Sequence, residues 1–257
     1  MSGDVLVILQ ARMSSSRFPG KVLNEINGKP MIFWQVQRIR KSKISENLIV
    51  ATSTDVSDDP LEHYLRSNNI RVARGPLNNV YKRFSDILIS PPKYQIVVRL
   101  TGDCPLVMPN LIDHAVKLFK ESDLDYLSNT ICPTYPDGLD VEVFYAQAFL
   151  RLKELNLTEA EKEHVTLAFH RKSLQIKSGN FSNDQDLSRL RWTVDYKEDL
   201  DFVRKIYKKF QGHETTFDFS DILKLLENEP WLNSDMSGTL RNEALQSLTE
   251  EGPNASI

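Results

Sequence analysis

Short apolar runs alternate with amphipathic stretches along most of the chain. Apolar residues at helical spacing predict helices over 31–41, 58–66, 80–89, 109–120, 146–155, 158–172, 198–206 and 219–227. Runs that are rich in β-branched residues, or that alternate between apolar and polar residues, predict strands over 5–9, 47–53, 70–72, 94–100, 125–127, 139–143, 174–177 and 190–195. The pattern therefore predicts strands and helices in alternation.

This alternation predicts an α/β fold with a single, mostly parallel sheet that helices cover on both faces. In such a sheet, ligands bind beyond the carboxyl ends of the strands. The chain has 257 residues, of which 40% are apolar and 26% are charged, and these values suit one large domain. We place this domain at residues 1–232 and expect the polar stretch 233–257 to be a flexible tail.

Charge and cysteine content narrow the class of protein. The net charge of −3 gives no reason to expect nucleic acid as a partner, but residues 11–43 hold eight Lys and Arg against the single acid Glu25, which favours a local anionic ligand. Cys104 and Cys132 form neither a disulfide framework nor a zinc-ligand spacing. The N-terminus lacks a signal-peptide pattern, and no apolar run approaches the ~18 residues of a membrane span. We therefore expect a cytoplasmic protein without a membrane partner.

The loop after the first predicted strand carries the clearest candidate chemistry. Arg12, Arg17 and Lys21 place three cations on a short segment that also contains the hydroxyl residues Ser14 and Ser15. Triphosphates are usually held by backbone N–H groups and hydroxyls, with cations that neutralise the charge. The loop has neither the G-x-x-x-x-G-K-[ST] nor the G-x-G-x-x-G pattern of common phosphate-binding loops. A solvated basic loop is the alternative.

The segment ILQARMSSSRFPGK, residues 8–21, resembles the signature of the sugar-activating cytidylyltransferases, most closely the branch named after the spore coat polysaccharide protein SpsF. That signature reads roughly I-I-Q-A-R-M-G-S-T-R-L-P-G-K. The chain departs from it at Ser14, where the family usually has Gly, and conservatively at Ser16 and Phe18. The resemblance implies that backbone groups near residues 9–11 read the base and that the nucleotide-binding residues are Leu9, Gln10, Ala11, Arg12, Ser14, Ser15, Arg17, Lys21 and Thr101.

Two aspartates follow other predicted strands. Asp103 lies after the strand 94–100 in the sequence RLTGDCPL, and Asp195 ends the strand 190–195 in LRWTVDYKEDL. A carboxylate fixed at a strand end is a good ligand for a hard cation, although each Asp could instead cap the following helix. Similar motifs in the cytidylyltransferases hold Mg²⁺ at the nucleotide phosphates. The resemblance therefore implies that Asp103 and Asp195 bind Mg²⁺ and act with Arg17 and Lys21 as catalytic residues.

Three further residues are candidates for the acceptor side. Asp140 and Glu142 lie two residues apart on the predicted strand 139–143, so they point the same way and could meet a metal, a sugar hydroxyl or an Arg. A solvated strand face is the alternative. His164 lies in KEHVTL, after a capping box formed by Thr158 and Glu161. A motif similar to the first segment surrounds the acceptor sugar in the family, which implies substrate contacts for Asp140 and Glu142. The family shows R-E-H-V-T-P at the second segment, which implies a substrate or a dimer contact for His164, although a lone His on a helix is often structural.

Together, four motifs over residues 4–231 follow the family's order. The resemblance implies a glycosyltransferase-A-like nucleotidyltransferase fold with a mixed sheet. It also implies Mg²⁺-dependent transfer of CMP from CTP to a sugar acid, with release of pyrophosphate, in surface glycan biosynthesis, and a homodimer formed through an arm within 129–175. A nucleotidyltransferase that uses another nucleoside triphosphate or a non-sugar acceptor is one alternative. A non-catalytic nucleotide- or sugar-binding relative is another, and the retention of both aspartates speaks against it.

Overall fold

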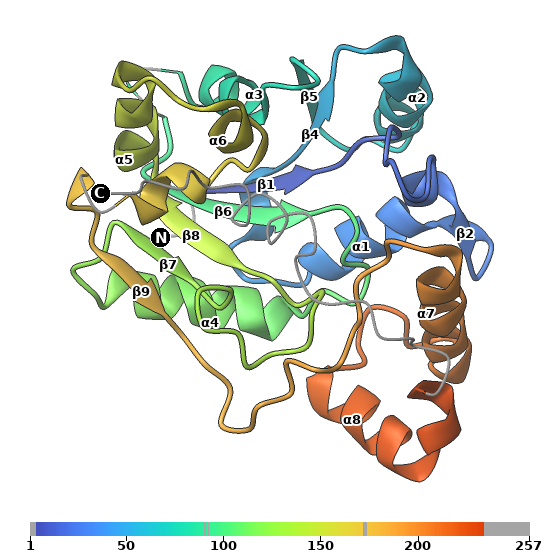
Figure 1. Cartoon of the computed structure of the whole chain (residues 1–257). Helices are drawn as coiled ribbons and strands as arrows, with labels where there is room; N and C mark the ends of the chain where they lie inside the picture. Colours follow the sequence, from blue (N-terminus) through green and yellow to red (C-terminus); the bar gives the residue numbers. More distant parts are fainter. Residues whose placement is uncertain (1–3, 90, 92, 172–173, 234–257) are drawn as a thin grey trace, which may run out of the picture.

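A seven-stranded mixed sheet forms the centre of the molecule (Figure 1). The computed structural model describes residues 4–89, 91, 93–171 and 174–233. Across the sheet the strand order is β5-β4-β1-β6-β8-β7-β9. These strands span Val5–Gln10 (β1), Leu48–Ser53 (β4), Val72–Gly75 (β5), Ile96–Thr101 (β6), Tyr126–Ser128 (β7), Glu142–Tyr145 (β8) and Ser178–Asn180 (β9).

The direction of the strands confirms the prediction of a mostly parallel sheet. β1 pairs in parallel with β4 and β6, and β4 pairs in parallel with β5. β8 runs antiparallel to both of its neighbours, β6 and β7, while β9 is parallel to β7. The carboxyl ends of β1, β4 and β6 consequently meet at one edge of the sheet, where ligands bind in folds of this kind.

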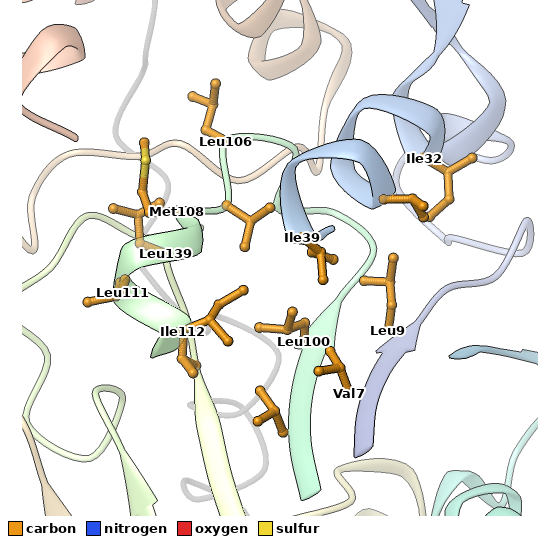
Figure 2. Close-up of a cluster of buried hydrophobic side chains, with 14 of the residues drawn as sticks. Val7, Leu9, Ile32, Ile39, Leu100, Leu106, Met108, Leu111, Ile112 and Leu139 are labelled. Carbon is orange, nitrogen blue, oxygen red and sulfur yellow. The ribbon is translucent and has the colours of Figure 1, made fainter. Parts of the chain in front are cut away.

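Helices cover both faces of the sheet, and a hydrophobic core lies on each face. The first core contains residues of α1, α2, α4, α7 and α8; Figure 2 shows part of it, with Leu9, Ile39 and Leu100 among the side chains that point toward one another. The second core contains residues of α3, α5 and the segment after α6. The helices span Met31–Ile39 (α1), Asp59–Ser67 (α2), Val80–Leu88 (α3), Pro109–Lys120 (α4), Ala146–Arg151 (α5), Glu159–Glu163 (α6), Lys197–Lys209 (α7) and Phe219–Asn228 (α8).

Several strand predictions were displaced along the chain. β5 starts at Val72 rather than at residue 70, and β8 starts at Glu142 rather than at residue 139. The strand predicted over 174–177 is wrong, because the chain pairs with β7 only from Ser178 to Asn180. Gly179 allows this pairing, since a Cβ there would lie 2.4 Å from a methyl group of Leu124. The sequence SGN has no apolar alternation from which β9 could be predicted.

The prediction of a strand over 190–195 is also wrong. This segment forms a single bridge, in which Asp137 N donates to Leu190 O at 2.8 Å and Trp192 N donates to Asp137 O at 2.6 Å. Its apolar residues Trp192 and Val194 are buried in the first core. The apolar pattern of 190–195 therefore reflects burial of an extended loop segment, not membership of the sheet.

Two further local differences are a shorter helix and an additional hairpin. The helix predicted over 158–172 begins with the expected capping box of Thr158 and Glu161 but ends at Glu163, and His164 has non-helical angles (φ −94°, ψ 71°). An unpredicted hairpin joins β2 (Glu25–Ile26) to β3 (Lys29–Pro30) ahead of α1. Its turn residues Asn27 and Gly28 both have positive φ (46° and 72°), as the Asn-Gly turn of a tight hairpin requires.

The range 129–175, where an arm was predicted, contains regular elements of the domain. The range 129–175 contributes β8 to the central sheet and also holds α5 and α6, which lie above the sheet beside α3 in Figure 1. The predicted tail lies outside the described residues from residue 234 onward.

Of the described helices, none combines the length and the apolar character that a bilayer crossing needs.

Candidate active site

A cavity of about 480 Å³ opens where β1 and β6 end. Five segments contribute to its wall: the loop after β1, the turn after β6, residues 130–142 up to the start of β8, the segment from α6 to the 3₁₀ helix η5 (Leu167–His170), and residues 191–196. The sequence-predicted residues that line it are Gln10, Ala11, Arg12, Ser15, Arg17, Lys21, Thr101, Asp103, Asp140, Glu142, His164 and Asp195.

Two predicted nucleotide-binding residues do not line this cavity. The side chain of Leu9 is fully buried in the first core, because it follows the inward alternation of Val5 and Val7 along β1. The hydroxyl oxygen of Ser14 is buried within the loop and has no hydrogen-bond partner among the described residues. The fold of the loop, which the sequence pattern does not show, decides which of its residues reach the wall.

The loop after β1 folds back on itself. The carbonyl of Met13 accepts hydrogen bonds from Ser15 N at 2.9 Å and from Gly20 N at 2.8 Å. Gly20 has φ 75°, a conformation that a residue with a Cβ rarely adopts. Met13 N donates to Oδ1 of Asp58 at 2.6 Å, and this buried carboxylate also accepts from Ser53 at the end of β4. Asp58 therefore ties the loop to the sheet.

Lys21 connects the two aspartates that the sequence analysis assigned to one site. It begins the 3₁₀ helix η1 (Lys21–Leu23) and is buried. Its Nζ donates to Asp195 Oδ1 at 3.0 Å, to Asp103 Oδ2 at 3.4 Å and to the carbonyl of Val194 at 2.6 Å. The structure therefore brings both carboxylates into contact with one ammonium group. We refer to Lys21, Arg17, Asp103, Asp195 and Arg191 as the Lys21 cluster.

Cations surround Asp195 more closely than Asp103. In addition to Lys21, Arg17 Nη2 lies 2.7 Å from Asp195 Oδ2 and Arg191 Nη2 lies 3.0 Å from the same oxygen. Burial alone raises the pKa of Asp195, but the charge of Lys21 and the hydrogen bonds from Arg17 and Lys21 outweigh it and lower the pKa to about 2. Burial likewise opposes the charge of Asp103, yet Lys21 keeps the pKa of that carboxyl below its usual value. Both aspartates are therefore ionised near pH 7.

A buried ion pair fixes the position of Asp195. Arg191 Nε and Nη2 donate to the two carboxylate oxygens of Asp199 at 3.1 and 3.2 Å. Asp199 Oδ2 in turn accepts from the backbone N of Asp195 at 2.8 Å and of Tyr196 at 2.9 Å, at the start of α7. Asp195 is thus held by its backbone through Asp199 and by its side chain through Arg191.

The donor set of the cluster suits a hard cation that also binds phosphate. The described residues contain no group of three or more His, Cys, Asp and Glu side chains that could hold a metal. Mg²⁺, however, is commonly bound by one or two carboxylates, with phosphate oxygens and water completing its shell. Asp103 and Asp195 both line the cavity and both contact Lys21 Nζ, so two carboxylates of the kind that binds such an ion lie within one site. Asp103, whose side chain is 31% exposed, is the less enclosed of the two.

A second polar group lies on the sheet itself. Arg99 of β6 faces Glu142 of β8, its partner in the strand register, and Arg99 Nη1 donates to Glu142 Oε2. The other oxygen of Glu142 accepts from the hydroxyls of Tyr126 and Thr166, each at 2.9 Å. Arg99 also donates to Gln10 Oε1 from Nε at 3.3 Å and from Nη2 at 3.2 Å. We refer to Arg99, Gln10, Glu142, Tyr126 and Thr166 as the Arg99 network. Glu142 is consequently a buried, paired carboxylate, not part of a solvated strand face.

The other candidates on this side lie on the cavity wall. Arg12 Nη2 lies 3.6 Å from Glu163 Oε1, and both side chains are partly exposed. Burial lowers the pKa of His164 below its ordinary value of 6.5, so the imidazole is neutral near pH 7. Asp140 also lines the cavity. Thr101 also lies on the wall, with its hydroxyl 3.2 Å from Cys104 Sγ.

The cations of residues 11–43 do not form one anion-binding surface. Arg12, Arg17 and Lys21 line the cavity, each in an ion pair with a carboxylate from another segment. Arg38 is fully buried and donates to backbone carbonyls, among them Val107 O at 2.8 Å. The positive sequence balance therefore overstated the charge available to a ligand.

Sequence reasoning missed several residues of the site. Five residues of the two polar groups were assigned no role in the sequence analysis. They are Arg191, Asp199, Arg99, Tyr126 and Thr166. Arg99 could have been found, because it is a lone charge within the apolar run 96–100. A charge in a buried strand needs a partner.

Comparisons with known proteins place the chain among cytidylyltransferases. The family model described as cytidylyltransferase matches residues 6–235. The chain is 33% identical to the spore coat polysaccharide biosynthesis protein SpsF of Bacillus subtilis over 238 residues, which cover 88% of this chain and 95% of that protein. It is 29% identical to 3-deoxy-manno-octulosonate cytidylyltransferase of Bartonella tribocorum, over 49% of this chain and 51% of that one. A solved cytidylyltransferase structure from Leptospira borgpetersenii superposes with a TM-score of 0.85 at 28% identity and covers 92% of this chain and 99% of that chain.

Proposed function

Because the chain belongs to the cytidylyltransferase family, we propose that this nucleotidyltransferase moves CMP from CTP to a hydroxyl of a sugar acid and releases pyrophosphate. Two of these relatives support the substrate class. One is named for 3-deoxy-manno-octulosonate, a sugar acid, and the other for the biosynthesis of a polysaccharide. The proposed product is an activated sugar for surface glycan synthesis.

The observation that carries the proposal is the contact of Lys21 Nζ with both Asp103 and Asp195 on the wall of one cavity. The burial and the two carboxylates fix this ammonium in place. Together with Arg17, this ammonium places positive charge on the part of the cavity wall that the loop after β1 forms. Fixed charge of this kind stabilises a phosphoryl group in transfer because it needs no reorganisation during the reaction.

The proposed reaction is a substitution at the α-phosphorus of CTP. The oxygen of the acceptor hydroxyl forms a bond to this phosphorus as the hydroxyl passes its proton to solvent water, and the bond between the α-phosphorus and the bridging oxygen breaks. The electrons of that bond leave with pyrophosphate. Arg17 and Lys21 neutralise the charge that develops on the leaving group, and the loop backbone orients the triphosphate.

Asp103 and Asp195 are the residues that would hold Mg²⁺. When bound there, Mg²⁺ would supply positive charge next to the phosphates. The contacts of Asp195 with Arg17, Lys21 and Arg191 keep this carboxylate ionised and oriented. Asp103 has one cationic contact in the cluster, at 3.4 Å, which leaves it the more available for a cation.

The test is release of pyrophosphate with each nucleoside triphosphate, Mg²⁺ and a panel of sugar acids that includes 3-deoxy-manno-octulosonate. We expect release with CTP and at least one acid. Asp103→Asn and Asp195→Asn should reduce turnover by at least 100-fold, on the scale of other electrostatic groups in active sites. Asp201→Asn, which changes an exposed carboxylate of α7, is the matched control.

Calorimetry with CTP separates a missing acceptor from a wrong reaction. A wild-type protein that binds CTP only with Mg²⁺ but releases no pyrophosphate lacks its acceptor in the panel. A wild-type protein that binds no CTP, with or without Mg²⁺, contradicts the proposed function.

A further inference from the structure

The side-chain amide of Gln10 has a fixed orientation. Its Oε1 accepts both hydrogen bonds from Arg99, at 3.3 and 3.2 Å. A guanidinium has only donors, so the amide atom that faces Arg99 must be the oxygen. The NH₂ group is therefore turned away from Arg99. Gln10 is half-buried on the cavity wall, and no described residue accepts a hydrogen bond from this NH₂.

The strand register explains why Gln10 lies here. Side chains alternate along β1, so Leu6 and Ile8 enter the second core and Gln10 follows them on the same face. On β6, Val97 is followed in the same way by Arg99, and on β8 Phe144 shares this face with Glu142. Three apolar rows thus end in polar residues at one place, and these residues form the Arg99 network.

The other polar side chains of the network are hydrogen-bonded to one another. Arg99 is balanced by Glu142, and Glu142 also accepts from Tyr126 and Thr166. Satisfied networks of buried polar groups hold their members rigidly. Gln10 is consequently a rigid, uncharged donor at the cavity wall.

The other charged groups nearby are already paired. Arg12 lies 3.6 Å from Glu163, and Arg99 pairs with Glu142. The cations Arg17 and Lys21, which would meet an incoming phosphate, lie in the Lys21 cluster. An acceptor that enters on the side of Glu142 and His164 therefore meets neutral donors.

We propose that the side chain of Gln10, held by Arg99, donates a hydrogen bond to a carboxylate oxygen of the sugar acid and so selects the acceptor. This inference rests on the proposed function and deepens it. It also changes the sequence-based assignment of Gln10, whose side chain serves the acceptor and not the nucleotide. Gln10 alone among the cavity residues then presents an amide donor whose polarity a neighbouring residue fixes.

Gln10→Glu is the sharpest test, because it keeps an oxygen toward Arg99 and replaces the NH₂ group by a second oxygen. A donor becomes an anionic acceptor with almost no change of shape. We expect the KM for the sugar acid to rise at least tenfold and the KM for CTP to change less than twofold. Gln147→Glu, which makes the same charge change at an exposed position of α5, should leave both values unchanged.

CTP binding, measured by calorimetry without any acceptor, decides the matter even if the wild-type enzyme shows no turnover with the panel. A Kd for CTP within twofold of the wild-type value in Gln10→Glu supports the inference. A Kd weakened more than fivefold places the side chain at the nucleotide and overturns it. Unchanged KM values for both substrates in an active Gln10→Glu enzyme also overturn it. Absence of CTP binding by the wild type refutes the proposed function first, and the inference falls with it.

Discussion

The Lys21 cluster and the Arg99 network lie on the wall of the same cavity, yet they are built differently. The Lys21 cluster joins a loop, a turn and the extended segment 191–196, and three cations from these segments converge on the single carboxylate of Asp195. The Arg99 network joins mainly adjacent strands, and its one cation is balanced by one carboxylate. Several cations gathered at one place suit an anionic ligand, whereas strand-borne, neutral polarity suits positioning.

This difference separates two tasks within one site. A group that meets a triphosphate must offer charge that the protein has not fully neutralised. A group that selects a sugar must hold its donors and acceptors still. Substitutions should therefore affect the two regions in different measurements: turnover for the Lys21 cluster, and folding stability or acceptor affinity for the Arg99 network.

The largest expected effect is that of Lys21→Met. The substitution keeps an apolar stem but removes the charge that lies between Asp103 and Asp195. Loss of one fixed electrostatic group in an active site typically lowers kcat by about 10²–10³-fold. Steady-state release of pyrophosphate measures this fall.

Lys29→Met serves as the control, because Lys29 is an exposed cation of β3. It should leave kcat unchanged. If Lys21→Met folds normally and turns over within tenfold of the wild type, the cluster does not provide the charge that the comparison assigns to it.

The second effect concerns stability. Arg99→Met leaves Glu142 buried without its cationic partner. Breaking a buried ion pair from one side costs about 3–5 kcal/mol in the free energy of unfolding. Urea unfolding should show this loss, and the double variant Arg99→Met/Glu142→Gln should recover part of it because no lone charge remains.

Lys82→Met provides the contrast on the surface. It breaks the exposed pair of Lys82 with Asp86 on α3 and should cost less than ~0.5 kcal/mol. Equal losses from Arg99→Met and Lys82→Met would mean that the Arg99 network does not support the sheet.

The two regions were also unequal in what the sequence revealed. The loop with Arg12, Arg17 and Lys21, and the aspartates Asp103 and Asp195, stood out because their motifs are local in the chain. The partners of Glu142 lie on three other segments, so only the strand register shows them. The sequence motifs thus identified charged residues of the site, whereas only the contacts between distant segments show which of these charges are paired.

The fold shows the same division. The parallel strands and α4 were predictable, since each carries a strong apolar pattern of its own. β9 was not, because a polar strand is held only by its pairing with β7. The hairpin of β2 and β3 was missed although Asn27-Gly28 is a strong turn pattern.

A third prediction uses pH. The pKa of Asp195 in the folded protein, about 2, lies below its ordinary value of 3.8. A lowered pKa means that this carboxylate stabilises the fold above pH ~4 and that the contribution is lost as the pH falls from about 4 toward 2. The thermal midpoint of the wild type should therefore fall more steeply over this window than that of Asp195→Asn.

Asp201→Asn should keep the wild-type slope, since Asp195 and its three cations are intact in it. Parallel curves for the wild type and Asp195→Asn would show that the ionised carboxylate of Asp195 does not stabilise the folded protein.

The smallest effect is expected for Ser14→Gly, which restores the glycine usual in the family. The Ser14 hydroxyl is buried without a partner among the described residues, so its removal relieves roughly 1–3 kcal/mol. The added freedom of Gly in the unfolded chain opposes this by roughly 0.5–1 kcal/mol. Because Asp58 and the carbonyl of Met13 already shape the loop, we expect the calorimetric Kd for CTP to change less than about threefold. A glycine at position 102, by contrast, is required by the packing. In Gly102→Ala the new Cβ would lie 2.8 Å from the Cβ of Ala11 and push β1 and β6 apart. If Ser14→Gly tightened CTP binding tenfold, close backbone approach, and not the charge of the Lys21 cluster, would govern nucleotide affinity.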